Sequence, residues 1–264
     1  MIKTHNFPKI HHLHKAEELV RTQNIDHIQS NEILSFHIHM IEKSMDLIDY
    51  FSRQYESEND EQKTIQILGL QIFNQSASAL KLILSGYYHA SISVKRSLLE
   101  TMFLLDYFST DNALIKEWNK NDKKTRKQGG KFSPTEIRIK LDDRDGFENK
   151  KRHQHYERLC ELGTHPTPTS FVMLKPIPEG DFYCGPFFAP IMTKGSIEEL
   201  ALVAIQIAGH FSQFFKAKKL DDYRVTISFM ETQDLWNKRF NKISSKWTEI
   251  DELKKLLKLA EQYL

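Results

Sequence analysis

The sequence predicts an all-helical protein, built as a bundle of long antiparallel helices. Apolar residues recur at helical spacing through most of the chain, as in the series Ile41, Met45, Ile48. Only 10 of the 264 residues are glycine, while leucine, isoleucine, lysine and glutamate are plentiful, and this composition favours helix over sheet. Six of the eight prolines lie between Pro166 and Pro190. Proline disfavours helix, so we expect a small extended or hairpin excursion in that segment, outside the bundle.

Composition and charge exclude several classes of protein. Hydrophobic residues make up 40% of the chain, which is enough for the core of a single helical-bundle domain over residues 1–264. The formal net charge of +2 gives no general attraction to nucleic acid or to a membrane. Cys160 and Cys184 form neither a disulfide framework nor a metal-binding pattern. The first residues lack the apolar core of a signal peptide, so we expect a cytoplasmic protein with no membrane partner.

The hydrophobic pattern predicts the helices in order. Residues 1–27 are an N-terminal lead-in that becomes amphipathic toward its end. A basic connector is expected at 116–131, because it holds many lysines and arginines and ends in a glycine pair. Ser133 and Ser196 are each followed by glutamate three residues later, a capping-box spacing that predicts helix starts there. The predicted helices are 28–55, 62–85, 86–108, 133–145, 147–162, 196–219, 225–243 and 248–263.

The predicted helix 86–108 carries a polar stripe between two apolar flanks. His89, Ser93, Arg96 and Glu100 follow one another at spacings of four, three and four residues, which places them on one side of a helix. A buried charge without a partner costs several kcal/mol, so the rest of the chain must supply partners for this stripe. Arg96 and Glu100 also have the i, i+4 spacing of an ordinary ion pair, and a purely structural role is the simplest interpretation of Glu100.

Arg158 and His165 are the candidate catalytic residues. They lie seven residues apart, close to two helical turns, so their side chains leave one helix face about 10 Å apart along the axis. Gly163 is expected to end the regular helix, which leaves His165 at a C-terminus where the dipole favours its protonated form. A histidine can transfer protons and a guanidinium can stabilise an oxyanion. The alternative is that the spacing arises by chance and that His165 caps its own loop.

Other kinds of site have little support. No Glu-x-x-His pair of the kind that holds two metal ions occurs, and the sequence has no phosphate-binding glycine loop and no nucleophile elbow. We therefore expect no metal and no cofactor. Within the connector, the default interpretation of Lys123, Lys124, Arg126 and Lys127 is a solvated loop, and the alternative is a weak RNA contact.

Two segments resemble a group of prokaryotic all-helical proteins. The first combines Ala90 with the run 96–100, Arg-Ser-Leu-Leu-Glu; the second combines Tyr156 and Leu159 with His165-Pro166. The group is similar to the HEPN (higher eukaryotes and prokaryotes nucleotide-binding) superfamily, and the match covers about 80 residues. The resemblance implies a helical bundle that often dimerises and, in active members, a metal-independent ribonuclease with an Arg-x4-6-His motif. Arg158 and His165 have the longest spacing that this motif permits.

The resemblance also implies roles for the site residues. His165 would take the proton of the ribose 2′-OH, Arg158 would stabilise the pentacoordinate phosphate, and Arg96 with Glu100 would orient the pair. Active members usually have a polar residue directly after the motif arginine, whereas this chain has Leu159. Many such proteins act in toxin–antitoxin or phage-defence systems, so the expected partners are RNA, an antitoxin or other regulatory protein, and a second copy of the chain.

The competing hypothesis is a non-catalytic helical interaction or ligand-binding module. In that case Arg96, Glu100, Arg158 and His165 form an enclosed polar network that fixes helix register. Under the ribonuclease hypothesis, by contrast, His89 and Tyr156 join Arg96 and Glu100 as supporting residues of the site. The two hypotheses differ in one respect that a structure can address: the enzyme needs Arg158 and His165 accessible, and the structural module encloses them.

Overall fold

A computed structural model describes residues 9–120, 122–177, 179–242 and 248–262. The first eight residues of the expected lead-in lie outside this set. The described residues are helical or irregular and contain no strand, which confirms the all-helical fold class. The elements are α1 Ile10–Gln29, α2 Glu32–Arg53, α3 Asp60–Leu84, α4 Tyr88–Thr110, α5 Ala113–Asn119, α6 Lys123–Arg126, α7 Pro134–Arg144, α8 Lys151–Leu159, η1 Cys160–Thr164, η2 Pro168–Leu174, α9 Pro190–Ser212, α10 Leu220–Trp236, η3 Asn237–Asn241 and α11 Thr248–Gln262.

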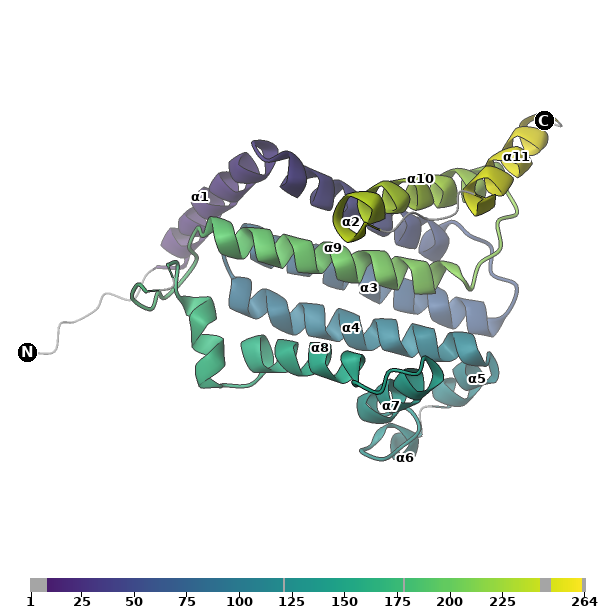
Figure 1. Ribbon diagram of the computed structural model, residues 1–264, viewed down its shortest axis with the longest axis horizontal. Coiled ribbons are helices and arrows are strands. Elements are labelled where there is room, and N and C mark those ends of the chain that lie inside the picture. Colours follow the sequence, from purple (N-terminus) through teal and green to yellow (C-terminus); the bar gives the residue numbers. More distant parts are fainter. Residues whose placement is uncertain (1–8, 121, 178, 243–247, 263–264) are drawn as a thin grey trace, which may run out of the picture.

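Four long helices, α2, α3, α4 and α9, form the centre of the bundle (Figure 1). α10 packs on the outer side of α2, and the hairpin of α7 and α8 packs on the outer side of α4 (Figure 1). α9 is the most apolar of these helices, and its side chains Ile197, Leu200 and Ile207 are fully buried. Because several sides of α9 are buried, it lacks the broad polar face that an amphipathic surface helix presents to solvent.

α4 and α9 run side by side in the same direction. Tyr88 contacts Thr193 near the start of both helices, where their hydroxyls are 2.9 Å apart. Further along, Asp106 of α4 lies 3.8 Å from His210 of α9. The two contacts are separated by nearly the same number of residues in each helix, so the register is kept over their whole length.

The predicted helix over residues 28–55 is wrong at its beginning. Ile28 belongs to the last turn of α1, and α2 starts only after Asn31. The Asn31 side chain accepts hydrogen bonds from the backbone N–H groups of Ile33 and Leu34 at 3.0 and 3.2 Å, which caps α2 and interrupts the helix. Apolar spacing continues across this break, so periodicity alone does not reveal it.

The predicted helix start at Ser196 is also wrong. α9 begins at Pro190, and Ser196 lies buried inside it. Proline fits the first helical position because its missing N–H would have no partner there. By contrast, Ser133 caps α7 as expected: its hydroxyl accepts from the backbone N–H of Glu136 at 3.3 Å, with Pro134 at the first position.

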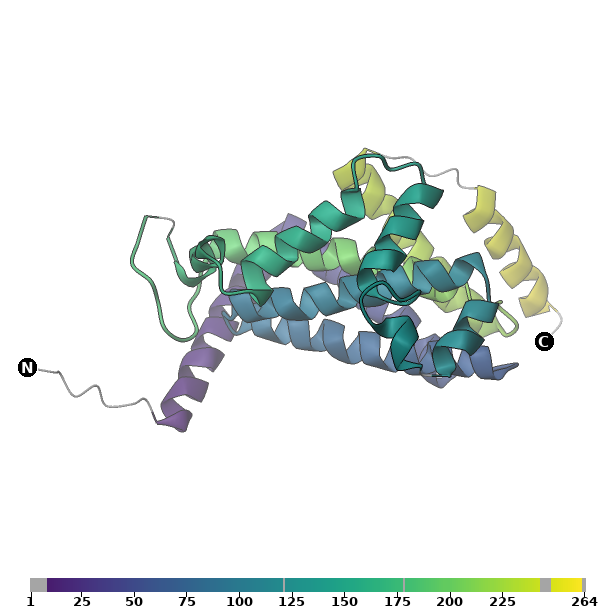
Figure 2. The same ribbon diagram turned by 90° about the horizontal axis from the view of Figure 1, so that it is seen from below.

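Part of the excursion over residues 166–190 protrudes from the helical body as a loop (Figure 2), whereas η2 within it contacts α4 and η1. The expectation of an extended or hairpin structure is wrong for the first half of this excursion, where Pro168–Leu174 forms the 3-10 helix η2. Pro168 begins that short helix after Thr167, whose hydroxyl accepts from the backbone N–H of Ser170. The backbone N–H of Tyr183 donates to the carbonyl of Leu174 at 2.8 Å and joins the two arms of the loop.

One helix of the described residues, α3, is long and apolar enough to cross a membrane by length and composition. Such a helix is weak evidence for a membrane span, because core helices of soluble proteins have the same properties. α3 contacts α2, α4 and α9 and buries Ile65, Ile72 and Ile83 against them, as a core helix does.

The contact between α4 and η1 gives a stability prediction. A Cβ atom added at Gly163 would lie 2.4 Å from Cβ of Ile92, so Gly163→Ala forces the backbone apart. We expect a loss of about 1–3 kcal/mol in the free energy of unfolding, measured by urea denaturation.

Gly209→Ala is the matched control, since nothing lies within 4 Å of its added Cβ in α9. There we expect no loss, or a gain of up to about 1 kcal/mol. Equal effects of the two substitutions would show that the contact with Ile92 is not tight.

Candidate functional site

The polar stripe of α4 meets its partners on α8. Arg96 donates from Nη1 to the Tyr156 hydroxyl at 3.0 Å, and that hydroxyl donates to Oε1 of Glu100 at 2.8 Å. Nη1 of Arg96 lies 3.7 Å from Oε1 of Glu100, which is too far for a direct hydrogen bond, so the Tyr156 hydroxyl connects the two side chains. Burial and the hydrogen bond to Glu100 raise the pKa of Tyr156 to about 12. All three side chains are half-buried, and the network fixes α8 on α4.

The other two members of the stripe differ in what they contact. Ser93 donates to the carbonyl oxygen of Gly163 at 2.6 Å and so binds the π-helix η1 to α4. His89 is half-buried, and its side chain makes no hydrogen bond or ion pair with any residue that the structure describes. Of the supporting residues predicted from the sequence, the structure therefore brings Arg96, Glu100 and Tyr156 together and leaves His89 apart from them.

Arg158 and His165 are both exposed. Arg158 lies in the last turn of α8, and His165 directly follows η1, where its backbone N–H donates to the carbonyl of Cys160 at 3.0 Å. η1 closes i to i+5 hydrogen bonds instead of i to i+4, so it uses more residues per turn than an α-helix. The two side chains therefore do not share a face in the way that an uninterrupted α-helix predicts. Neither side chain belongs to the Arg96 network.

The basic residues Lys123, Lys124, Arg126 and Lys127 are exposed, and the first three belong to α6. α6 lies below α7 in Figure 1, at the end of the bundle that also holds α5. Arg158 and His165 lie at and beyond the last turn of α8. The structure thus does not bring the basic residues next to the candidate catalytic pair within one chain.

A groove of about 710 Å³ opens between α8, α9 and the end of α10. Its walls are mainly apolar, and Arg158 lies on its rim. The apolar lining consists of Ile92, Leu162, Val172, Met173, Ile191, Met192, Leu202, Trp236 and Phe240. The titratable lining consists of His37, Lys95, His155, Arg158, Glu198 and Glu199.

A buried ion pair forms one side of this groove. Lys95 of α4 is only 1% exposed, and its ammonium group binds the carboxylate of Glu199 on α9. The other oxygen of Glu199 lies 3.9 Å from Nε2 of His155 on α8. Burial acts to raise the pKa of Glu199, but His155 and Lys95 outweigh it and hold the pKa at about 2. Glu199 is therefore a permanent carboxylate that connects three helices.

His37 is buried at another part of the groove. Its Nδ1 accepts a hydrogen bond from the indole N–H of Trp236 at 2.9 Å, and its ring stacks on Phe240 at 4.2 Å between centroids. Burial lowers the pKa of His37 to about 4, and the charges of Arg239 and Lys194 add to this effect. The imidazole is therefore neutral at pH 7, with its proton on Nε2.

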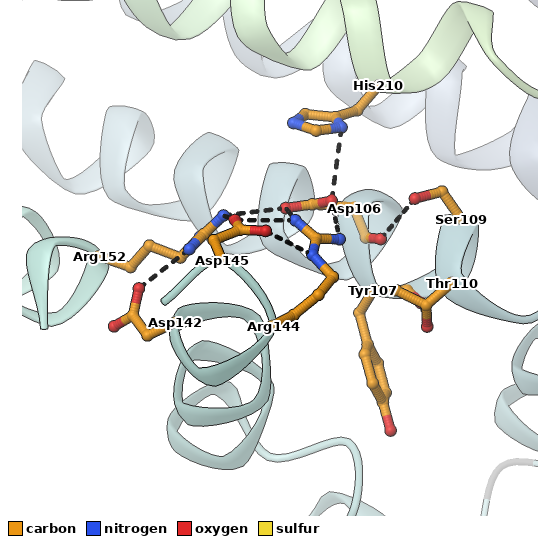
Figure 3. A network of polar contacts seen from close by, with 9 residues as sticks. All are labelled: Asp106, Tyr107, Ser109, Thr110, Asp142, Arg144, Asp145, Arg152 and His210. Carbon is orange, nitrogen blue, oxygen red and sulfur yellow. Dashed lines mark hydrogen bonds and ion pairs between the residues drawn. The ribbon is translucent and has the colours of Figure 1, made fainter. Parts of the chain in front are cut away.

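A second charged network lies at the far end of α4 (Figure 3). Asp106 accepts from Arg144 at 2.8 Å and from Arg152 at 3.4 Å, and both arginines also bind Asp145. The hydrogen bond from Arg144 holds the pKa of Asp145 well below its usual range. Burial lowers the pKa of His210, which faces Asp106 from α9. Every carboxylate drawn in this network is matched by an arginine, which indicates a structural clamp for the α7–α8 hairpin.

Sequence reasoning missed the Lys95–Glu199 pair and His37. Lys95 directly precedes Arg96 but belongs to another side of α4, and an isolated lysine in a helix is normally exposed. Among the residues that the structure describes, no group of three or more metal-ligating side chains comes together. Comparisons with protein-family models, curated proteins and solved structures found no match to this chain.

Removal of one hydroxyl tests the Arg96 network. Tyr156→Phe leaves Arg96 and Glu100 half-buried without the group that connects them. We expect a loss of about 1–3 kcal/mol in the free energy of unfolding, measured by urea denaturation. Tyr223→Phe is the control, because the Tyr223 hydroxyl has no hydrogen-bond partner in the described part of the chain, and no loss is expected there. An unchanged free energy of unfolding in Tyr156→Phe would contradict a stabilising role of the network.

The pKa of His37 predicts a pH dependence of stability. Below pH 6.5 the unfolded chain takes up a proton that the folded state excludes until about pH 4. The His37 contribution is therefore constant above pH 6.5, and stability falls by up to about 3 kcal/mol as the pH drops from 6.5 to 4.

His37→Gln removes the titration and keeps an acceptor for the Trp236 N–H. Urea denaturation of both proteins from pH 7 to pH 4 should show that the free energy of unfolding of the variant falls less steeply than that of the wild type. If the free energies of the two proteins fall in parallel, His37 titrates normally in the folded state.

Proposed function

We propose that this protein is a metal-independent endoribonuclease of the HEPN type that acts as a homodimer in a toxin–antitoxin or phage-defence system. The observation that carries the proposal is the exposure of Arg158 and His165 at the end of α8. An enzyme needs both side chains accessible, whereas the structural alternative encloses them. The resemblance of the segments around Arg96 and Tyr156 to that superfamily supplies the reaction.

In the proposed reaction His165 accepts the proton of the ribose 2′-OH, and the 2′ oxygen attacks the adjacent phosphorus. Arg158 stabilises the negative charge that develops on the phosphoryl oxygens. The bond to the 5′ oxygen breaks and that oxygen takes up a proton, from the protonated His165 or from water, which leaves a 2′,3′-cyclic phosphate and a 5′-OH end. Arg96 and Glu100 are positioning residues in this scheme, because they act on α8 through Tyr156 and do not bind Arg158 or His165.

A dimer would complete the proposed site. Because η1 takes His165 off the face of α8 that carries Arg158, a composite site can combine these residues from two copies. Exposed apolar side chains of the adjacent excursion, a feature typical of protein interfaces, support such a contact. They are Phe171, Val172, Ile177 and Phe182. The basic residues of α6 would then contact RNA away from the reacting phosphate.

A second candidate function is a non-catalytic interaction or ligand-binding module. It is favoured by one observation: Arg96, Tyr156 and Glu100 bind one another without any contact to Arg158 or His165. Its polar groups then serve only to fix α8 on α4. In this case substitution of Arg158 or His165 has no effect on any reaction.

The test is cleavage of total RNA by the purified protein in EDTA, with Arg158→Ala and His165→Ala beside the wild type. We expect each variant to lose at least about 100-fold in rate while it remains folded, since both side chains are exposed. Arg53→Ala, an exposed arginine on α2, is the control for loss of one positive charge and should cleave normally. Absence of cleavage by folded wild type, or full activity of both site variants, would contradict the proposal.

A further inference from the structure

The groove between α8, α9 and the end of α10 has the properties of a small-molecule site. Its volume of about 710 Å³ is within the range of roughly 300–1,000 Å³ that is typical of ligand pockets. Flexible methionines, Met173 and Met192, lie in its wall with branched aliphatic residues, and Trp236 and Phe240 close one side. Such walls suit the apolar body of a small organic molecule.

A buried hydrogen-bond donor in the groove has no partner. Nδ1 of His37 accepts from Trp236, so in the neutral ring the proton lies on Nε2. His37 is only 2% exposed, and Nε2 makes no hydrogen bond to the residues that the structure describes. The nearest anionic oxygen, Oε1 of Glu198, is 3.9 Å away, too far for a hydrogen bond. Buried donors are normally satisfied, so this one points to an acceptor that a ligand would supply.

The charged side chains of the groove indicate the sign of the charge on that ligand. Glu199 is already matched by Lys95 and His155, and Glu198 lies 3.9 Å from the ammonium group of Lys194. The guanidinium group of Arg158, on the rim, forms no ion pair within the described ranges. Among the charged side chains of the groove, Arg158 is therefore the one whose charge is not matched within the described residues, and that charge is positive.

We propose that this groove binds a small organic carboxylate with an apolar body. The carboxylate oxygens would accept from Nε2–H of His37 and from the guanidinium of Arg158, while the apolar body lies against the methionines and aliphatic side chains of the wall. An ionised acceptor gives stronger hydrogen bonds than a neutral one, and a guanidinium pairs well with a carboxylate. This binding does not depend on RNA cleavage.

The test is isothermal titration of the 264-residue chain with decanoate, with decylamine as a probe of the same chain length and opposite charge. We expect decanoate to bind at a single site and decylamine not to bind. Arg158→Ala and His37→Phe should each weaken decanoate binding by at least about 10-fold. Arg53→Ala, which removes a positive charge outside the groove, should bind like the wild type.

Circular dichroism checks that each variant is folded, and Arg158→Ala alone decides the outcome if His37→Phe is not, because Arg158 is exposed. No heat of binding up to millimolar decanoate would overturn the proposal. Equal binding of decylamine, or unchanged affinity in Arg158→Ala, would also overturn it, because either result would show nonspecific adsorption to apolar surface.

Discussion

The arrangement of helices depends on the buried ammonium group of Lys95. A lysine that is 1% exposed must be matched by an opposite charge, because an uncompensated buried charge costs several kcal/mol. Its partner, Glu199, comes from α9, and Glu199 also faces His155 of α8. One carboxylate therefore fixes the distance of α8 and α9 from α4. The groove lies where these helices meet, so its shape depends on this pair.

Other polar side chains of α4 also need specific partners on neighbouring helices. It is buried almost all round, and apolar contact alone would permit several rotations and shifts of its neighbours. Arg96 and Glu100 are satisfied only when Tyr156 stands between them, and Asp106 only when Arg144 and Arg152 reach it (Figure 3). The polar residues of α4 thus select one placement of the α7–α8 hairpin, whereas the apolar residues provide the driving force.

The sequence predicts the long helices well and their ends less well. Apolar spacing identified α3 and α4 almost to their ends, because each is bounded by clear signals such as Gly86. It failed at Asn31, where the apolar pattern continues across a cap, and at Pro190, where a proline-rich segment hides a helix start. Both errors arise because a cap depends on the conformation of a single residue, which periodicity does not report.

The site was predictable only in part. The stripe on α4 showed that Arg96 and Glu100 needed partners, and Tyr156 lay in a segment already singled out. His37 and Trp236, however, are 199 residues apart in sequence and meet only because α10 packs on α2. Similarly, the π-helix η1, which changes the relation between Arg158 and His165, packs with Gly163 close to Ile92 of α4. No local pattern contains these long-range contacts.

A double-mutant cycle between Lys95 and Glu199 tests the central claim most directly. Urea denaturation would be measured for wild type, Lys95→Met, Glu199→Gln and the double variant. If the pair holds α9 and α8 on α4, each single substitution leaves one buried charge unmatched. The double variant should then lose less free energy of unfolding than the two single variants lose together, by at least about 2 kcal/mol. Losses that add to within about 0.5 kcal/mol would contradict the account, because residues that do not interact behave in that way.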